Sequence, residues 1–179
     1  MNETLRMIEQ RFSCRAYQEK PVSRELIDQL LKAGLQAPSA LNRQPWKIVV
    51  ITNKELLTKM DILGMKKLQE NEDQSAYERF MKRGGKLFYN APAMFVILQR
   101  PGRDIDTGIL AQNIVLAAES LGLNSVHCGM ARLLMSDPEI QEKLRITPEW
   151  EFGHSILIGY GLAKNKPHEI SLSQTSIID

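Results

Sequence analysis

The chain has 179 residues, of which 43% are hydrophobic and 25% charged, and this size and composition favour one domain with a sizeable core. Its formal net charge is only +2, which argues against a general nucleic-acid binder because such proteins carry a clustered basic face. No apolar run approaches the roughly 18 residues that span a bilayer, and residues 1–12 lack the continuous apolar stretch of a secretory signal. We expect a cytoplasmic protein without a nucleic-acid or membrane partner, whose two cysteines, Cys14 and Cys128, stay reduced.

Two amphipathic helices are predicted near the start of the chain. Residues 2–10 place Leu5 and Ile8 on one helical face. The second helix begins at Ser23, a suitable N-cap. It ends before Pro38, because proline disfavours the helical conformation of the residue that precedes it.

A strand and a long polar region follow. Residues 46–52 are rich in β-branched side chains and predict a buried strand. Residues 54–84 are helical but polar, with weak points at Gly64 and at 70–73, which is typical of a mobile cover. Further strands are predicted at 94–98, 125–128 and 155–158.

The predicted helix over residues 105–121 is the most informative element. It carries two adjacent apolar stripes, one through Leu110 and Ile114 and the other through Ala111 and Val115. A helix that is apolar on more than one side is buried on more than one side, and in so small a protein we expect the second contact to be another subunit.

Two local signals delimit elements around the last strands. Gly122 is expected to end the long helix, and Ser136 with Glu139 forms a predicted capping box at the start of a later helix. Helices and strands do not alternate regularly along the chain, so the pattern predicts the α+β class and not a doubly wound sheet.

Three polar constellations could bind an anionic or heteroaromatic ligand. In Arg11-Phe12-Ser13-Cys14-Arg15, two guanidinium groups flank a hydroxyl and could hold a phosphate by forked hydrogen bonds. In residues 37–46, A-P-S-A-L-N-R-Q-P-W, two prolines constrain a loop that could present Ser39 and Asn42 to a planar ring. Residues 164–168, K-N-K-P-H, could add cations for a phosphate.

Each constellation also has a structural interpretation. The first could be a solvated helix end, the second a connection whose Ser and Asn cap turns, and the third a solvated cationic loop. Elsewhere, His127 and Cys128 are neighbours on a predicted strand and point to opposite faces, so they cannot form a catalytic dyad. The three histidines lack paired metal spacing, and we predict neither a metal site nor a catalytic amino-acid side chain.

The constellations occur together and in a distinctive order. R-x-S-x-R-x-Y from Arg11, A-P-S-x-x-N-x-Q-P-W about 25 residues later, a long helix that ends at glycine, and a terminal I-G-Y-G together resemble the nitroreductase family of FMN-dependent NAD(P)H oxidoreductases. The resemblance extends from Arg11 to about His168. It implies a mixed, mainly antiparallel sheet surrounded by helices, in an intertwined homodimer built around the long central helix.

The resemblance also implies where the cofactor lies. Residues 1–179 would form one FMN-binding domain, with the tail from about residue 165 embracing the partner subunit. The FMN phosphate and ribityl end would be held by Arg11, Phe12, Ser13 and Arg15. The partner subunit would supply Pro38, Ser39 and Asn42 to the isoalloxazine.

Three further positions complete the site that the resemblance implies. The Cys128-Gly129 peptide would lie beside the flavin with an N–H near N5. Lys166 and His168 fall where the family often has a Lys-x-Arg pair, so the histidine departs from that pattern. Cys128 also departs from it, since the best-known nitroreductases often have an acidic residue at this position.

The implied function is a ping-pong transfer of hydride from NADH or NADPH, through flavin N5, to a small acceptor such as a nitroaromatic, a quinone or an enone. The cofactor carries the chemistry and the protein orients it, so no side-chain nucleophile is required. Two alternatives are a specialised family reaction, such as flavin fragmentation, dehalogenation or azoline oxidation, and a non-catalytic dimeric module that binds FMN.

Overall fold

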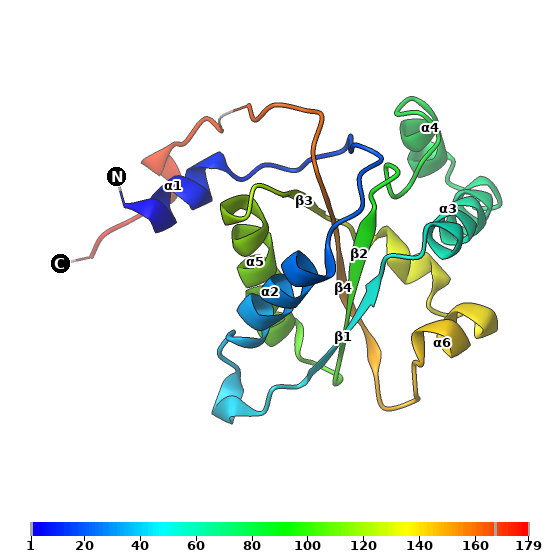
Figure 1. The fold of residues 1–179 in the computed structure, drawn as a ribbon, viewed down its shortest axis with the longest axis horizontal. Helices are drawn as coiled ribbons and strands as arrows, with labels where there is room; N and C mark the ends of the chain where they lie inside the picture. The colour runs from blue at the N-terminus through cyan, green and yellow to red at the C-terminus, as the bar shows by residue number, and fades with distance from the viewer. Residues whose placement is uncertain (1, 167, 179) are drawn as a thin grey trace.

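The computed structural model describes residues 2–166 and 168–178, so Pro167 of the K-N-K-P-H segment lies outside the described residues. Its centre is one four-stranded sheet in the order β1-β2-β4-β3, in which every neighbouring pair is antiparallel. The strands are β1 (Trp46–Ile51), β2 (Ala93–Gln99), β3 (Asn124–His127) and β4 (Glu151–Gly159). Helices cover both faces of the sheet (Figure 1), which confirms the predicted α+β class.

One face of the sheet is covered by α2 (Arg24–Leu35) and α5 (Asp104–Ser120). Ser23 caps α2 as predicted, because its side chain accepts the N–H of Leu26. The two helices pack so closely that a Cβ on Gly34 would lie 2.7 Å from Cγ1 of Ile114.

Both predicted stripes of α5 are therefore buried within one protomer. Leu110, Ala111, Ile114 and Val115 are all shielded by the sheet and by α2. The expectation that the second stripe contacts another subunit is wrong, because α2 already covers it. A third side of the helix stays accessible, where Ile105 is 81% exposed and Ile109 37%.

The other face is covered by α3 (Lys54–Gln69), α4 (Ser75–Met81), the 3-10 segment η2 (Gly129–Leu134) and α6 (Pro138–Leu144). The predicted polar region is thus two helices, separated at the weak point around residues 70–73. The predicted capping box at Ser136 is wrong. Asp137 is the N-cap of α6, and its carboxylate accepts the N–H groups of Glu139 and Ile140 at 3.1 Å each, since the following Pro138 starts the helix one residue later than predicted.

The two ends of the chain lie together beside α1 (Glu3–Gln10) (Figure 1). After α1 the chain runs along the sheet, where the Cys14 N–H donates to Ser125 O at 2.9 Å and the Gln18 N–H to Tyr160 O at 2.8 Å. The remaining short 3-10 segments are η1 (Ala40–Asn42) and η3 (Leu172–Gln174). Within the described ranges, no helix is both long and apolar enough to cross a membrane.

Replacement of Gly64 by alanine tests the packing of α3. Alanine favours a helix over glycine by about 1 kcal/mol, but a Cβ on Gly64 would overlap the side chain of Leu87, which is fully buried. Because overpacking costs about 1–3 kcal/mol, we expect Gly64→Ala to lower the free energy of unfolding in urea. Thr58→Ala, at an exposed position of the same helix, is the control and should change it by less than about 0.5 kcal/mol. A stabilised Gly64→Ala protein would contradict this account of the packing.

Candidate cofactor site

The segment after α1 is extended and lies against β3. Ser13 forms a bridge with Ser125. Because alternate side chains of extended backbone point to opposite sides, Cys14 is fully buried in the core while Ser13 and Arg15 face outward. Arg15 is exposed and donates to its own segment at Ser13 O, 3.4 Å away. Ser13 and Arg15, two of the three polar side chains predicted to bind a phosphate, thus lie on the same outward side of this segment.

The C-terminal segment brings further cations to the same place. The side-chain amide of Asn165 donates to Gln10 O at 2.7 Å and Glu9 O at 3.3 Å, and so satisfies carbonyl groups at the end of α1. This contact places His168 against Arg11, with Arg11 Nη2 3.4 Å from His168 Nε2. Lys166 is exposed between these two contacts. The structure therefore brings together Arg11 and His168, which are 157 positions apart in the chain.

The turn at Cys128 and Gly129 is held by one buried serine. The Cys128 N–H donates to Ser155 O at 2.9 Å, and the Ser155 hydroxyl donates to Cys128 O. Ser155 is 0% exposed. Gly129 opens η2, and its N–H meets no acceptor in the described part of the chain. A Cβ on Gly129 would contact nothing within 4 Å, so there is open space beside this residue.

The environment of Cys128 keeps its thiol neutral. Burial raises the pKa of Cys128, while the N–H groups of Met130 and Ala131 and the charge of Arg15 act in the opposite direction. Phe12 packs against the same apolar cluster as Cys128. Phe12, Arg15 and Cys128 thus belong to the same region of the protomer, and their contact with a flavin stays a prediction.

On the opposite face, His127 pairs with His154, a contact that the sequence did not predict. His127 Nδ1 lies 3.0 Å from His154 Nε2, and His127 Nε2 lies 3.3 Å from Oε1 of Gln112 on α5. Burial lowers the pKa of His154 to about 4, helped by the charges of His127 and Arg132. Burial and the charge of Arg11 also lower the pKa of His127. The pair therefore consists of neutral imidazoles near pH 7, and His127 does not contact the Cys128 thiol across the strand.

The loop over residues 37–46 is held in a strained conformation. Ser39 Oγ accepts the Gln44 N–H at 2.9 Å, and Asn42 Oδ1 accepts Gln44 Nε2 at 3.1 Å. Leu41, Asn42 and Gln44 have φ values of 54°, 50° and 47°, in the left-handed region that non-glycine residues seldom adopt. Leu41 is also 84% exposed. Strain of this kind persists where the surrounding contacts fix it, and it is frequent at functional sites.

Asp106, which is buried, attaches this loop to the beginning of α5. Its carboxylate accepts the N–H of Ala40 at 3.1 Å. Arg11 lies near the other end of α5, close to Glu119. Burial raises the pKa of Glu119, and the positive charge of Arg11 offsets part of this rise. At 1.5 Å per residue, Asp106 and Glu119 are about 20 Å apart along the helix. One protomer therefore does not bring Pro38, Ser39 and Asn42 to the segment of residues 11–15.

Comparisons with known proteins agree on one family. The model of the nitroreductase family matches residues 8–160. A protein of Archaeoglobus fulgidus, provisionally named an NADH dehydrogenase/NAD(P)H nitroreductase, is 34% identical over 138 residues, which cover 73% of this chain and 69% of that protein. The NADPH-flavin oxidoreductase of Vibrio harveyi is 32% identical over 137 residues, which cover 74% of this chain and 55% of that protein. A solved nitroreductase with bound FMN from Desulfitobacterium hafniense is 39% identical, with a TM-score of 0.95 over the whole of both chains.

The His127–His154 pair predicts a pH dependence of stability. An unfolded histidine has a pKa of about 6.5, so between pH 6.5 and about 4 the unfolded chain binds more protons than the folded chain. The free energy of unfolding should therefore fall as the pH is lowered through this window. His154→Gln, whose amide can still pair with His127, should reduce the slope by up to one proton per chain in urea titrations at successive pH values. The control Thr58→Ala changes an exposed side chain that carries no titratable group and should leave the slope unchanged. Equal slopes for wild type and His154→Gln would contradict the assignment.

Proposed function

The chain belongs to the nitroreductase family, and from that premise we propose that residues 1–179 form one FMN-binding domain of a homodimeric reductase. It is an oxidoreductase of the nitroreductase type, with FMN as cofactor and NAD(P)H as reductant. We propose that it transfers hydride from NADH or NADPH to a small acceptor, a nitroaromatic, a quinone or an enone, in a ping-pong cycle. The observation that carries the dimeric site is a separation within one protomer. The loop of residues 37–46 lies at the start of α5, and residues 11–15 lie near its end.

A second copy of the chain would unite these halves. If two α5 helices cross in opposite directions about a two-fold axis, the loop at the start of one helix lies near residues 11–15 at the end of the other. The accessible side of α5, with Ile105 and Ile109, supplies an apolar contact for that crossing. Ile170, Leu172 and Ile177 of the C-terminal segment are highly exposed, as expected of a tail that packs on a partner subunit.

The residues at the end of α5 fit the phosphate of FMN. Arg11 and Arg15 offer guanidinium donors, the Ser13 hydroxyl offers a neutral one, Lys166 adds positive charge from the tail, and His168 adds an imidazole beside Arg11. Charge-assisted hydrogen bonds of this kind are the strong ones in phosphate recognition. A dianionic phosphate would also relieve the mutual repulsion of these cations.

The Gly129 N–H fits the edge of the flavin ring. When bound, FMN supplies the hydride chemistry at its N5 atom. The Gly129 N–H would be a donor for that atom, because Ser155 engages the N–H and the C=O of Cys128 and the next N–H has no acceptor in the described part of the chain. Arg15 places positive charge near the ring, and the neutral Cys128 thiol adds none. Ser39 and Asn42 of the partner subunit would contact the ring from the other side.

A cytoplasmic location suits this function. Both cysteines are free and buried, which agrees with a reducing compartment.

The first test is a visible spectrum of the purified protein, followed by anaerobic addition of NADH and, in a second sample, NADPH. Flavin bands should bleach with at least one reductant and return when an acceptor such as a quinone is added. Protein that remains colourless after incubation with FMN would contradict the proposal.

Arg11→Ala combined with Arg15→Ala tests the phosphate site. Loss of two charge-assisted donors should weaken FMN binding at least about a hundredfold, measured by flavin fluorescence, with little change in the circular dichroism spectrum. The control Arg24→Ala with Lys143→Ala removes the same charge from exposed positions on other helices and should keep full affinity. Full flavin occupancy in the Arg11/Arg15 variant would show that the phosphate lies elsewhere.

Ile105→Glu combined with Ile109→Glu tests the composite site. Two carboxylates on the accessible side of α5 should prevent association, so the variant should elute as a monomer by light scattering and lose FMN together with its dimeric state. Ile62→Glu on α3, at a similarly exposed isoleucine, is the control and should stay dimeric. A monomer with undiminished FMN affinity would refute the partner's contribution to the site.

A further inference from the structure

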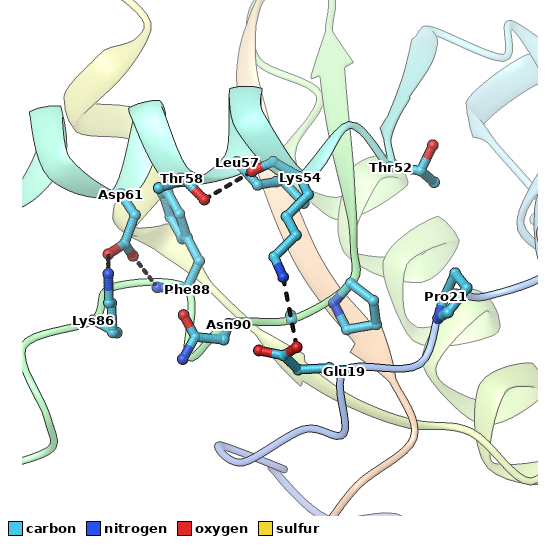
Figure 2. Close-up of a pocket in the computed structure, with 12 residues that line it drawn as sticks. Glu19, Pro21, Thr52, Lys54, Leu57, Thr58, Asp61, Lys86, Phe88 and Asn90 are labelled. Atoms are coloured by element: carbon cyan, nitrogen blue, oxygen red, sulfur yellow. Dashed lines mark hydrogen bonds and ion pairs between the residues drawn. The ribbon is translucent and has the colours of Figure 1, made fainter.

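A cavity of about 240 Å³ opens at the edge of the sheet opposite β3 (Figure 2). It lies between the first two turns of α3, the segment that leads into β2, and the stretch around Glu19 and Pro21. The proposed FMN residues lie beside β3, whereas this cavity adjoins the ends of β1 and β2 at Thr52 and Pro92. It shares no residue with the proposed FMN site.

Two pairs of opposite charges line the cavity. Lys54 Nζ lies 3.6 Å from Glu19 Oε2 at the outer end, and Lys86 Nζ lies 3.6 Å from Asp61 Oδ2 at the inner end. Direct charge-assisted hydrogen bonds are about 2.7–2.9 Å long, so neither pair is closed. Each charged group retains hydrogen-bonding capacity toward a ligand.

Asp61 is the group that points most clearly to a ligand. It is only 5% exposed, and a buried carboxylate needs several donors to offset its lost hydration. Its Oδ1 accepts the Phe88 N–H at 2.8 Å. Among the described residues, its Oδ2 has only the Lys86 ammonium as a partner, at 3.6 Å. This oxygen can therefore accept a hydrogen bond from a ligand in the cavity.

The space beside the Asp61–Lys86 pair is apolar. Leu57, Phe88 and Pro92 are among the residues that line the cavity. Because one water occupies about 30 Å³ in the liquid, the cavity has room for a ligand of roughly eight non-hydrogen atoms. Next to Phe88, Tyr89 and Asn90 both have left-handed φ values, of 52° and 54°, and Asn90 turns its side chain toward the cavity (Figure 2).

We propose that this cavity binds a small zwitterion, an α-amino acid with an apolar side chain. The ammonium and carboxylate of such a molecule are adjacent and opposite in sign, which matches the adjacent carboxylate of Asp61 and ammonium of Lys86. The ligand ammonium donates to Asp61 Oδ2 and its carboxylate accepts from Lys86 Nζ. Its side chain packs on Leu57 and Phe88. The proposal does not rest on the reductase function and adds a second site to the protein.

Isothermal titration of the 179-residue chain, with FMN in excess, tests the proposed ligand class. The probes are L-valine, L-leucine and L-methionine, with 4-methylpentanoate and 3-methylbutylamine as analogues of leucine that lack one charged group each. At least one amino acid should bind saturably. If leucine binds, each analogue should bind at least about tenfold more weakly. Absence of saturable binding by all three amino acids, or equal affinity of leucine and either analogue, overturns the proposal.

Two substitutions test the residues. Asp61→Asn keeps an oxygen that can accept the Phe88 N–H but removes the charge, and Lys86→Met changes a side chain that is 39% exposed and not required for packing. Each should weaken amino-acid binding at least about tenfold without changing the flavin spectrum. Lys66→Met, an exposed lysine of α3 outside the cavity, is the control and should bind normally. Unchanged affinity in Lys86→Met overturns the assignment even if Asp61→Asn is unstable.

Discussion

The packing of α5 between the sheet and α2 is the constraint on which the rest of the structure depends. Two sides of this helix are buried in the protomer, and Gly34 permits the close approach of α2. The helix is consequently a rigid spacer of fixed length, with Asp106 holding the loop of residues 37–46 at its start and Arg11 near its end. That spacing is why the candidate flavin residues fall into two separated groups and why a second subunit is proposed to join them.

Backbone groups, more than reactive side chains, are prepared for a ligand at the candidate site. Ser155 engages both polar groups of the Cys128 peptide, so the Gly129 N–H has a defined direction. In the loop, Gln44 engages the side chains of Ser39 and Asn42 and so holds the left-handed backbone of Leu41, Asn42 and Gln44 in place. Such preorganisation suits a protein whose cofactor performs the chemistry, because fixed donors stabilise developing charge without rearranging.

Charge is distributed differently at the two edges of the sheet. Near β3, Arg11 and Arg15 supply positive charge beside the proposed phosphate position. Beside β1 and β2, Asp61 and Lys86 present both signs within 3.6 Å, which suits a ligand that is neutral overall. The two proposed sites thus differ in electrostatic character, and they share no residue.

The sequence by itself determined the class of the fold, most element boundaries and the family, because caps, periodicity and motifs act over a few residues. Ser23 and the motif from Arg11 to Arg15 are such local signals. The local signals predicted the cap of α6 one residue too early. They also predicted a second subunit against a side of α5 that α2 covers. Only the tertiary structure decided the contacts between distant residues, such as Arg11 with His168, His127 with His154, and Asp61 with the Phe88 N–H. These depend on how helices and strands pack in space, and no local pattern of residues encodes which faces will meet.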